Sequence, residues 1–241
     1  MIITTSWDDG HRLDLKLADM LDQHRLKGTF YIARRYLDER MTDVQLRELS
    51  QRHELGAHTL THPTLTEIDD DTAREEIVGS KTWLEDVIGN SVTSFCYPKG
   101  MYTSTHREML HDAGYKMARA VTTYELSRGD DQLQVPTTVQ VYPFPLRPLK
   151  TLRGIRTRLQ PIRRFMPHRS RLNIPITSVR SWSALAIALL DEAQHRDGVW
   201  HLWGHSWEIE KFNMWSQLDD VLAIASTYQA QAKTNTELIQ S

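Results

Sequence analysis

Short runs typical of β-strands alternate with stretches whose apolar residues recur at helical spacing, along almost the whole chain. The expected strands cover residues 1–7, 28–33, 54–60, 91–98, 115–123, 133–143 and 198–205. The expected helices cover residues 11–24, 43–53, 70–89, 104–114, 181–196 and 214–229. Strands that alternate with helices normally lie parallel, so this order predicts an α/β fold of about seven units. In barrels and open sheets of this kind, functional side chains collect at the C-terminal ends of the strands.

The composition fits one globular domain. The chain has 241 residues, 40% of them hydrophobic, which is enough to bury a sizeable core. No repeat, low-complexity stretch or linker divides it, so we expect a single domain over residues 1–241. The only cysteine is Cys96, which excludes an internal disulfide. Because no apolar run has membrane-spanning length and the N-terminus does not resemble a secretory signal, the expected location is the cytoplasm.

The positive charge is concentrated in one stretch. Between Gln132 and Leu190 there is no Asp or Glu, whereas the same stretch contains ten Lys or Arg residues. Within it, residues 149–166 carry apolar side chains at steps of three or four with arginines between them. This pattern indicates a basic amphipathic insertion at about 145–172.

Three interpretations of the basic insertion stay open. Residues 147–171 could lie on an anionic membrane surface, which would make the protein peripheral at the inner membrane face. They could instead bind the phosphate of a nucleotide- or lipid-linked sugar. The simplest interpretation is a helix packed on the domain with a solvated basic outer face. No nucleic-acid-binding motif accompanies the charge, so we expect no nucleic-acid partner.

Two pairs of polar residues follow expected strands. Asp8 and Asp9 end the first strand, and His58 and His62 follow the third. Residues four apart in a helical turn lie on one face, so the two imidazoles could bind one metal ion together with Asp9. Asp8 would then be free to act as a general base. The structural alternatives are a turn or core role for the histidines and an N-cap role for Asp8.

The motifs "TTSWDDG" and "HTLTHP" resemble the first two motifs of the polysaccharide deacetylase family, the NodB-homology domain of carbohydrate esterase family four. "FCYPKG" resembles a divergent third motif, and "HLWGH" resembles the last. The resemblance extends from Ile2 to Trp207 in the expected order. It implies a distorted (β/α)7-type barrel in a single domain, and one divalent metal ion, usually zinc, with nickel or cobalt as alternatives. It also implies hydrolytic removal of an acetyl group from a saccharide or saccharide conjugate.

Carried over to this chain, the resemblance implies that Asp9, His58 and His62 bind the metal and that Asp8 is the base. His205 would be the general acid that protonates the departing amine, a role that suits a side chain with a pKa near neutrality. The turn formed by Pro98, Lys99 and Gly100 would provide a backbone N–H to the oxyanion. The structural alternatives are a packing role for His205 and a simple turn at residues 98–100.

The chain departs from the family pattern in two motifs. Cys96 stands where many members carry an arginine that orients the base, and Lys99 stands where they carry a tyrosine. Arg119, on a later strand, could replace the missing charge or be a surface residue. The family's partner of the general acid is also missing, and Glu208 could partner His205 or simply favour the start of a helix.

Three aromatic residues flank the expected site, namely Tyr97, Trp203 and Trp207. They could stack on sugar rings, but packing in the core is the commoner role of such residues. Cys96 lies in an apolar run without basic neighbours in sequence, so we interpret it as a packing residue. Two other functions stay open beside deacetylation: a metal-free cyclic amide or imide hydrolase of the same fold, and a non-catalytic carbohydrate-binding barrel.

Overall fold

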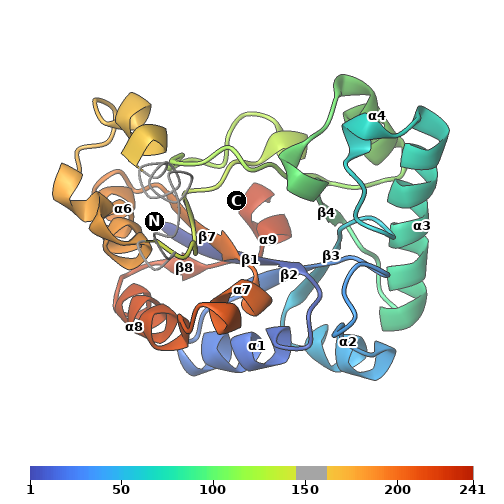
Figure 1. The fold of residues 1–241 in the computed structure, drawn as a ribbon, viewed down its shortest axis with the longest axis horizontal. Helices are drawn as coiled ribbons and strands as arrows, with labels where there is room; N and C mark the ends of the chain where they lie inside the picture. Colours follow the sequence, from blue (N-terminus) through green and yellow to red (C-terminus); the bar gives the residue numbers. More distant parts are fainter. Residues whose placement is uncertain (145–161, 241) are drawn as a thin grey trace, which may run out of the picture.

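The computed structural model describes residues 1–144 and 162–240, which form one curled sheet surrounded by helices (Figure 1). The strands are β1 (Ile2–Asp9), β2 (Gly28–Ile32), β3 (Glu54–Ala57), β4 (Ser94–Cys96), β5 (Met117–Arg119), β6 (Val139–Gln140), β7 (Val199–Gly204) and β8 (Gln231–Ala232). The helices are α1 (Asp14–Gln23), α2 (Asp43–Leu49), α3 (Asp70–Ile88), α4 (Ser104–Asp112), α6 (Trp182–His195), α7 (Ser206–Lys211), α8 (Trp215–Ser226) and α9 (Asn235–Ile239). The expected α/β architecture is confirmed.

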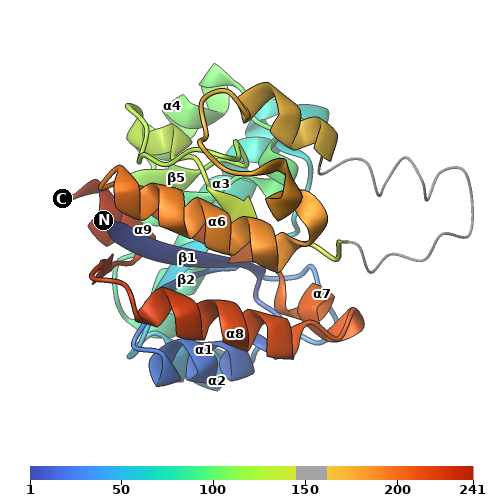
Figure 2. The same cartoon turned by 90° about the vertical axis from the view of Figure 1, so that its left-hand side faces the viewer.

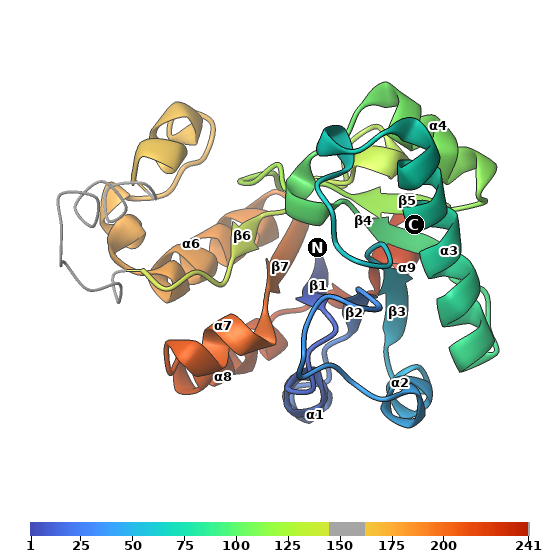
Figure 3. The same ribbon diagram turned by 45° about the vertical axis from the view of Figure 1, so that its right-hand side comes forward.

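The strand pairs of the described sheet are all parallel, in the order β5-β4-β3-β2-β1-β7-β6, with β8 beside the start of β1. The two edges of the sheet approach each other. Val135 forms a bridge with Arg119, and the N–H of Thr137 donates to the carbonyl oxygen of Thr122 at 2.7 Å. The sheet therefore curls into an incompletely closed barrel, as expected for a distorted (β/α) barrel. Figure 3 shows α1, α2 and α3 outside the strands.

The expected strands at 115–123 and 133–143 shrink to the short β5 and β6. Val135–Thr138, just before β6, are buried but pair irregularly. Pro136 provides no N–H, and the hydroxyl of Thr138 donates to the carbonyl oxygen of Glu125 at 2.7 Å, where a regular ladder would use backbone groups. The β-type composition of this stretch reflects burial, without a long regular strand.

Strand β1 is at the centre of the core, and every residue from Ile3 to Asp9 is buried. Helix α1 packs beside the neighbouring strand β2 through a stripe that includes Leu17 and Leu21 at helical spacing. Helix α3 begins where Asp69 accepts a hydrogen bond from the N–H of Thr72, and it ends at a left-handed glycine. These local signals explain why the longest described helix has its expected limits.

The C-terminal segment packs against the N-terminal ends of the strands, where sequence periodicity gave no signal. Figure 2 shows α9 beside the beginning of β1. Leu238 of α9 is buried against Met117, Val135 and Val199. Asn235 is also buried: it accepts a hydrogen bond from the Thr4 hydroxyl at 2.9 Å and donates one to the Tyr31 hydroxyl at 2.8 Å. This helix has five residues, too few for a recognisable amphipathic pattern.

We expect Asn235→Ala to lower the free energy of unfolding by about 1–3 kcal/mol, because it leaves two buried hydroxyls without their partner. Unfolding in urea measures the change. Gln240→Ala, an exposed change in the same segment, is the control and should stay within about 0.5 kcal/mol of the wild type. Equal stabilities of the two variants would show that the buried amide does not hold this end of the barrel together.

The expected basic insertion lies partly outside the described residues, since 145–161 are not among them. Its described part includes a short 3-10 turn at Met166–His168, and Phe165 and Leu172 are buried in the core. In the described ranges, no helix combines the length and apolar character needed to cross a membrane.

Candidate metal and catalytic site

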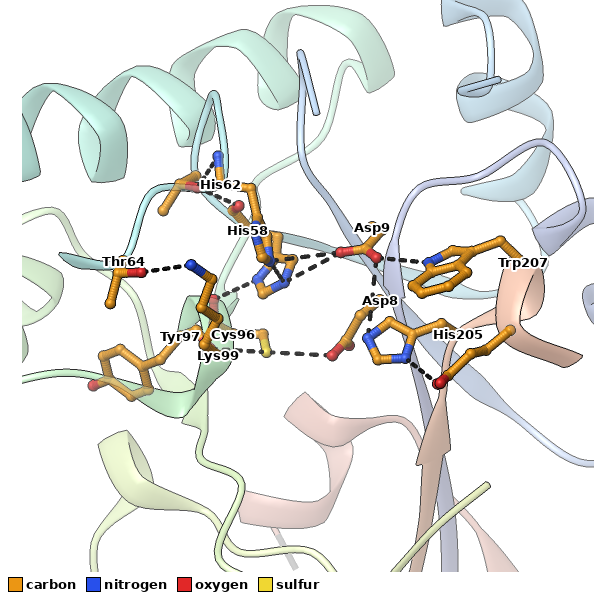
Figure 4. A network of polar contacts seen from close by, with 12 residues as sticks. Asp8, Asp9, His58, His62, Thr64, Cys96, Tyr97, Lys99, His205 and Trp207 are labelled. Carbon is orange, nitrogen blue, oxygen red and sulfur yellow. Dashed lines mark hydrogen bonds and ion pairs between the residues drawn. The ribbon is translucent and has the colours of Figure 1, made fainter. Parts of the chain in front are cut away.

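The expected site residues meet at the C-terminal ends of four strands. Asp8 and Asp9 end β1, His58 directly follows β3, Arg119 ends β5 and His205 directly follows β7. They lie in or beside a cavity of about 580 Å³. Figure 4 shows the two aspartates between the histidines of the β3 loop on one side and His205 on the other. The parallel topology therefore brings together residues that are far apart in sequence.

Asp9, His58 and His62 form a compact set of ligand atoms. The two histidine Nε2 atoms are 3.1 Å apart, and Asp9 Oδ1 lies 3.6 Å from His62 Nε2 and 3.8 Å from His58 Nε2. Asp9 Oδ1 is buried and has no hydrogen-bond partner within the described structure. The Nδ1 atom of His58 lies 2.7 Å from the carbonyl oxygen of Cys96, which fixes a proton on Nδ1 and leaves the Nε2 lone pair facing Asp9. These features fit one divalent cation.

The electrostatics of the set agree with metal binding. Burial lowers the pKa of His58 to about 4. Burial, together with the charge of His58, lowers the pKa of His62 to about 4. Both imidazoles are therefore neutral near pH 7, which is the form that binds a metal. Burial raises the pKa of Asp9, and a cation between the three side chains would compensate for that cost.

The His58–His62 loop is not the helical turn that the spacing suggested. Thr59 and His62 have φ angles of 66° and 60°, which are left-handed, and the loop continues in an irregular conformation to Pro63. Glu76 of α3 holds this loop, since its Oε2 accepts from the N–H of Thr61 at 2.8 Å. The imidazoles converge because two strained residues bend the chain, which spacing alone does not reveal.

Left-handed backbone is concentrated around this cavity. Four of the eight described non-glycine residues with positive φ line it, namely Asp9, His62, Lys99 and Tyr124. Such conformations cost about 1–3 kcal/mol each and are kept where function requires them. The backbone therefore marks the same site as the side chains do.

Arg119 is buried and forms an ion pair with Asp8 Oδ2, so it is not a surface residue. It also lies 2.8 Å from the sulfur of Cys96 and over the ring of Trp203. Burial alone would raise the pKa of Asp8, but the charge of Arg119, aided by His58 and His205, holds it below its usual range. Asp8 is therefore ionised, and its Oδ1 is buried without a partner in the described residues.

His205 faces the same carboxylates from the other side. Its Nε2 lies 4.0 Å from Asp9 Oδ2, and its Nδ1 lies 3.4 Å from Glu208 Oε2. Burial lowers the pKa of His205, but the bond to Glu208 and the charges of Asp8 and Asp9 outweigh it and raise the value. The glutamate identified in the sequence thus lies where it can stabilise the protonated imidazole.

The turn at residues 98–100 narrows the choice of a backbone donor to one residue. Pro98 has no N–H, and the N–H of Gly100 donates to the carbonyl oxygen of Tyr97 at 2.9 Å. Of the three residues, Lys99 is therefore the one left to offer an N–H to an oxyanion. Its φ is 55°, and its ammonium donates to the Thr64 hydroxyl at 2.7 Å. Gly100 is required for packing, because a Cβ there would lie 2.1 Å from Val121.

The three flanking aromatic residues have different surroundings. Tyr97 is buried and its hydroxyl donates to the carbonyl oxygen of Leu133 at 2.9 Å, as expected for core packing. Trp203 is also buried. The indole N–H of Trp207 donates to Asp9 Oδ2 at 2.9 Å, so it orients the carboxylate beside the metal set. Tyr36, which sequence reasoning missed, stacks on His62 with ring centres 4.1 Å apart and is 43% exposed.

Asp14 is a second residue that sequence reasoning missed. It is fully buried at the start of α1, and its Oδ1 accepts from the Ser206 hydroxyl at 2.5 Å. Since Ser206 lies between His205 and Trp207, this bond ties the segment carrying both to α1. A signal was available, because Asp14 shares the buried stripe of α1 with three apolar residues. A carboxyl on such a stripe is an exception that indicates a specific partner.

We expect Asp14→Asn to remove a pH dependence of stability. Burial raises the pKa of Asp14 well above its usual range. The stability that such a group contributes is present below its unfolded pKa of about 4 and is lost as the pH rises through the folded-state value. Between about pH 5 and pH 8, with a chelator present, the Tm of the wild type should therefore fall by a few degrees more than that of the variant. Parallel Tm curves would show that this carboxyl does not titrate in that range.

Comparisons with known proteins agree with this geometry. Residues 2–118 match the sequence model of the family described as polysaccharide deacetylase. A peptidoglycan-N-acetylglucosamine deacetylase of Bacillus cereus is 29% identical over 89 residues, which are 36% of this chain and 32% of that protein. The matches to curated relatives span less than half of those proteins' length.

Two solved structures share the fold over nearly the whole chain. The Bc1960 peptidoglycan N-acetylglucosamine deacetylase matches with a TM-score of 0.63 at 14% identity, covering 100% of this chain and 88% of that one. The wild-type BA3943 protein of Bacillus anthracis, described as a pseudoenzyme of carbohydrate esterase family four, matches with a TM-score of 0.57 at 14% identity, covering 99% and 65%. At such identities the likeness shows the fold alone.

Proposed function

We propose, on the premise that this chain belongs to the polysaccharide deacetylase family, that it is a metal-dependent hydrolase that removes an N-acetyl group from a sugar. The main support is the juxtaposition of the Asp9, His58 and His62 ligand atoms, 3.1–3.8 Å apart, beside the ionised Asp8. A cluster of this kind next to a free carboxylate is suited to hydrolysis of an amide.

Asp9, His58 and His62 would hold the ion, and zinc suits a set of two nitrogens and one carboxylate oxygen. When bound, the ion polarises the carbonyl group of the substrate and a water molecule. Asp8 accepts the proton of the attacking water through Oδ1. His205, protonated and supported by Glu208, donates a proton to the departing nitrogen. The N–H of Lys99 would be the backbone donor that stabilises the oxyanion.

The proposed substrate is an acetylated saccharide or a saccharide conjugate. The B. cereus relative is named for its action on N-acetylglucosamine, which supports an N-acetylated sugar here. Arg164 and His168 line the same cavity and could hold the phosphate of a nucleotide- or lipid-linked precursor. Such a precursor would place the activity in the cytoplasm or at the inner membrane surface. Arg164→Ala should then raise KM for the phosphorylated substrate and not for the free sugar.

Acetate release tests the proposed reaction. Protein stripped with a chelator should release no acetate from N-acetylglucosamine conjugates, and added zinc, nickel or cobalt should restore release up to one ion per chain. Release that survives removal of the metal would favour the metal-free cyclic-amide hydrolase. No release from any acetylated sugar by the fully loaded protein would favour a non-catalytic binding barrel.

A further inference from the structure

Part of the cavity lining consists of apolar side chains that the proposed chemistry does not use, and we call this part the apolar half, although Thr123, Gln140, Tyr142 and Ser181 also line the cavity. Its walls include Val121, Val139, Phe144, Val179, Trp182 and Leu185. All six lie after residue 118, outside the part of the chain that matches the family model, whereas the metal set and the base lie within it. These walls are therefore a feature that this chain builds with its own C-terminal half.

The elements that form these walls hold their apolar side chains inward. Trp182 and Leu185 are three residues apart on α6 and share one face of that helix. Val139 comes from β6, and Val179 from the 3-10 turn Ile176–Arg180 that precedes α6. The indole N–H of Trp182 donates to Gln217 Oε1 at 2.9 Å, so its polar edge is already satisfied. The ring can therefore face the cavity as an apolar surface.

Charge is absent from most of this lining. Among the described residues around the cavity, the only carboxylates are Asp8 and Asp9, and the only Lys or Arg residues are Lys99 and Arg164. The cavity volume of about 580 Å³ falls within the range of about 300–1,000 Å³ for sites that hold drug-sized ligands with largely apolar walls. A polar sugar with an acetyl group would leave such walls without a complementary partner.

We infer that the apolar half of the cavity binds an apolar group, an alkyl or aryl chain, attached to the sugar that carries the amide. This inference rests on the proposed function for the identity of that sugar. The apolar chain has two possible sources, the aglycone at the anomeric carbon or the acyl group of the amide itself. Both would bury methylenes against Val139 and Leu185, and each buried methylene should improve binding about threefold to fourfold.

A binding measurement tests the apolar half of the cavity without any hydrolysis. Hexyl β-glucoside, which has no amide, should bind at least about tenfold more tightly than methyl β-glucoside in calorimetry. Leu185→Phe, which fills the apolar half of the cavity with a larger side chain, should abolish this difference. Ile187→Phe changes a residue of the same helix that does not line the cavity, so it should preserve the difference. Equal binding of the two glucosides to the wild type would overturn the inference.

Two substrate series then identify the source of the chain. If it is an aglycone, kcat/KM should be at least about tenfold higher for hexyl than for methyl N-acetylglucosaminide. If it is an acyl group, kcat/KM should instead be higher for methyl N-hexanoylglucosaminide than for methyl N-acetylglucosaminide. If kcat/KM does not change with chain length in either series, the inference is contradicted, even if the protein releases acetate rapidly. Tight binding of hexyl glucoside without hydrolysis of any amide would refute the proposed function and leave the apolar site standing.

Discussion

Asp8→Asn should lower kcat for acetate release by about 100-fold to 10,000-fold, the range that a general base contributes. Asparagine cannot accept the proton of the attacking water, although it has nearly the same shape as aspartate. The metal content should not change, because Asp9, His58 and His62 are intact. Initial rates at saturating substrate, measured on protein with one ion per chain, give the comparison. A variant that keeps more than about a tenth of wild-type kcat would show that another group takes this proton.

Asp8→Asn has a second consequence, because Asp8 is also the counter-ion of a fully buried arginine. Breaking a buried ion pair on one side costs about 3–5 kcal/mol, since the remaining charge is left unpaired. The activity of the variant must therefore be measured at a temperature well below its Tm, where the protein is folded.

Arg119→Met should lower the free energy of unfolding by a similar amount, about 3–5 kcal/mol, for the complementary reason. Asp8 would then be buried without the charge that lowers its pKa. We expect its pKa to rise and the fraction available as a base to fall, so acetate release near neutral pH should decrease. Unfolding in urea and initial rates across a pH series measure the two effects.

The double variant Asp8→Asn, Arg119→Met separates stability from catalysis. Removal of both charges should make it more stable than either single variant, because no unpaired charge stays buried. Its acetate release should stay as low as that of Asp8→Asn. If the double variant is destabilised by the sum of the two single effects, the two side chains do not interact as the geometry indicates.

The sequence allowed part of this site to be predicted, and the limits have physical reasons. Asp8, Asp9, His58 and His62 are recognisable because each pair stands in a short motif at a strand end. The role of Arg119 could not be predicted in this way. It meets Asp8 only because β5 and β1 belong to the same curled sheet, 111 residues apart in sequence. Cys96, in the place of the usual arginine, is small enough to leave room for that guanidinium.

Other differences arise where tertiary contacts replace local patterns. The spacing of His58 and His62 suggested a helical turn, but left-handed residues produce the same convergence. Strands β5 and β6 are shorter than the β-type runs that contain them, because irregular pairing around Pro136 takes over. Helix α9 is too short to show periodicity, yet buried hydrogen bonds of Asn235 fix its position.

The metal content of the purified chain, expressed without a histidine tag, tests the central claim most directly. Zinc, nickel or cobalt should be present at about one ion per chain in the wild type and should be lost in His62→Ala. His168→Ala removes another histidine that lines the same cavity and should retain the ion. If the wild type binds no divalent ion even after incubation with each of them, or if His62→Ala retains it, the Asp9–His58–His62 site and the hydrolysis built on it would be contradicted.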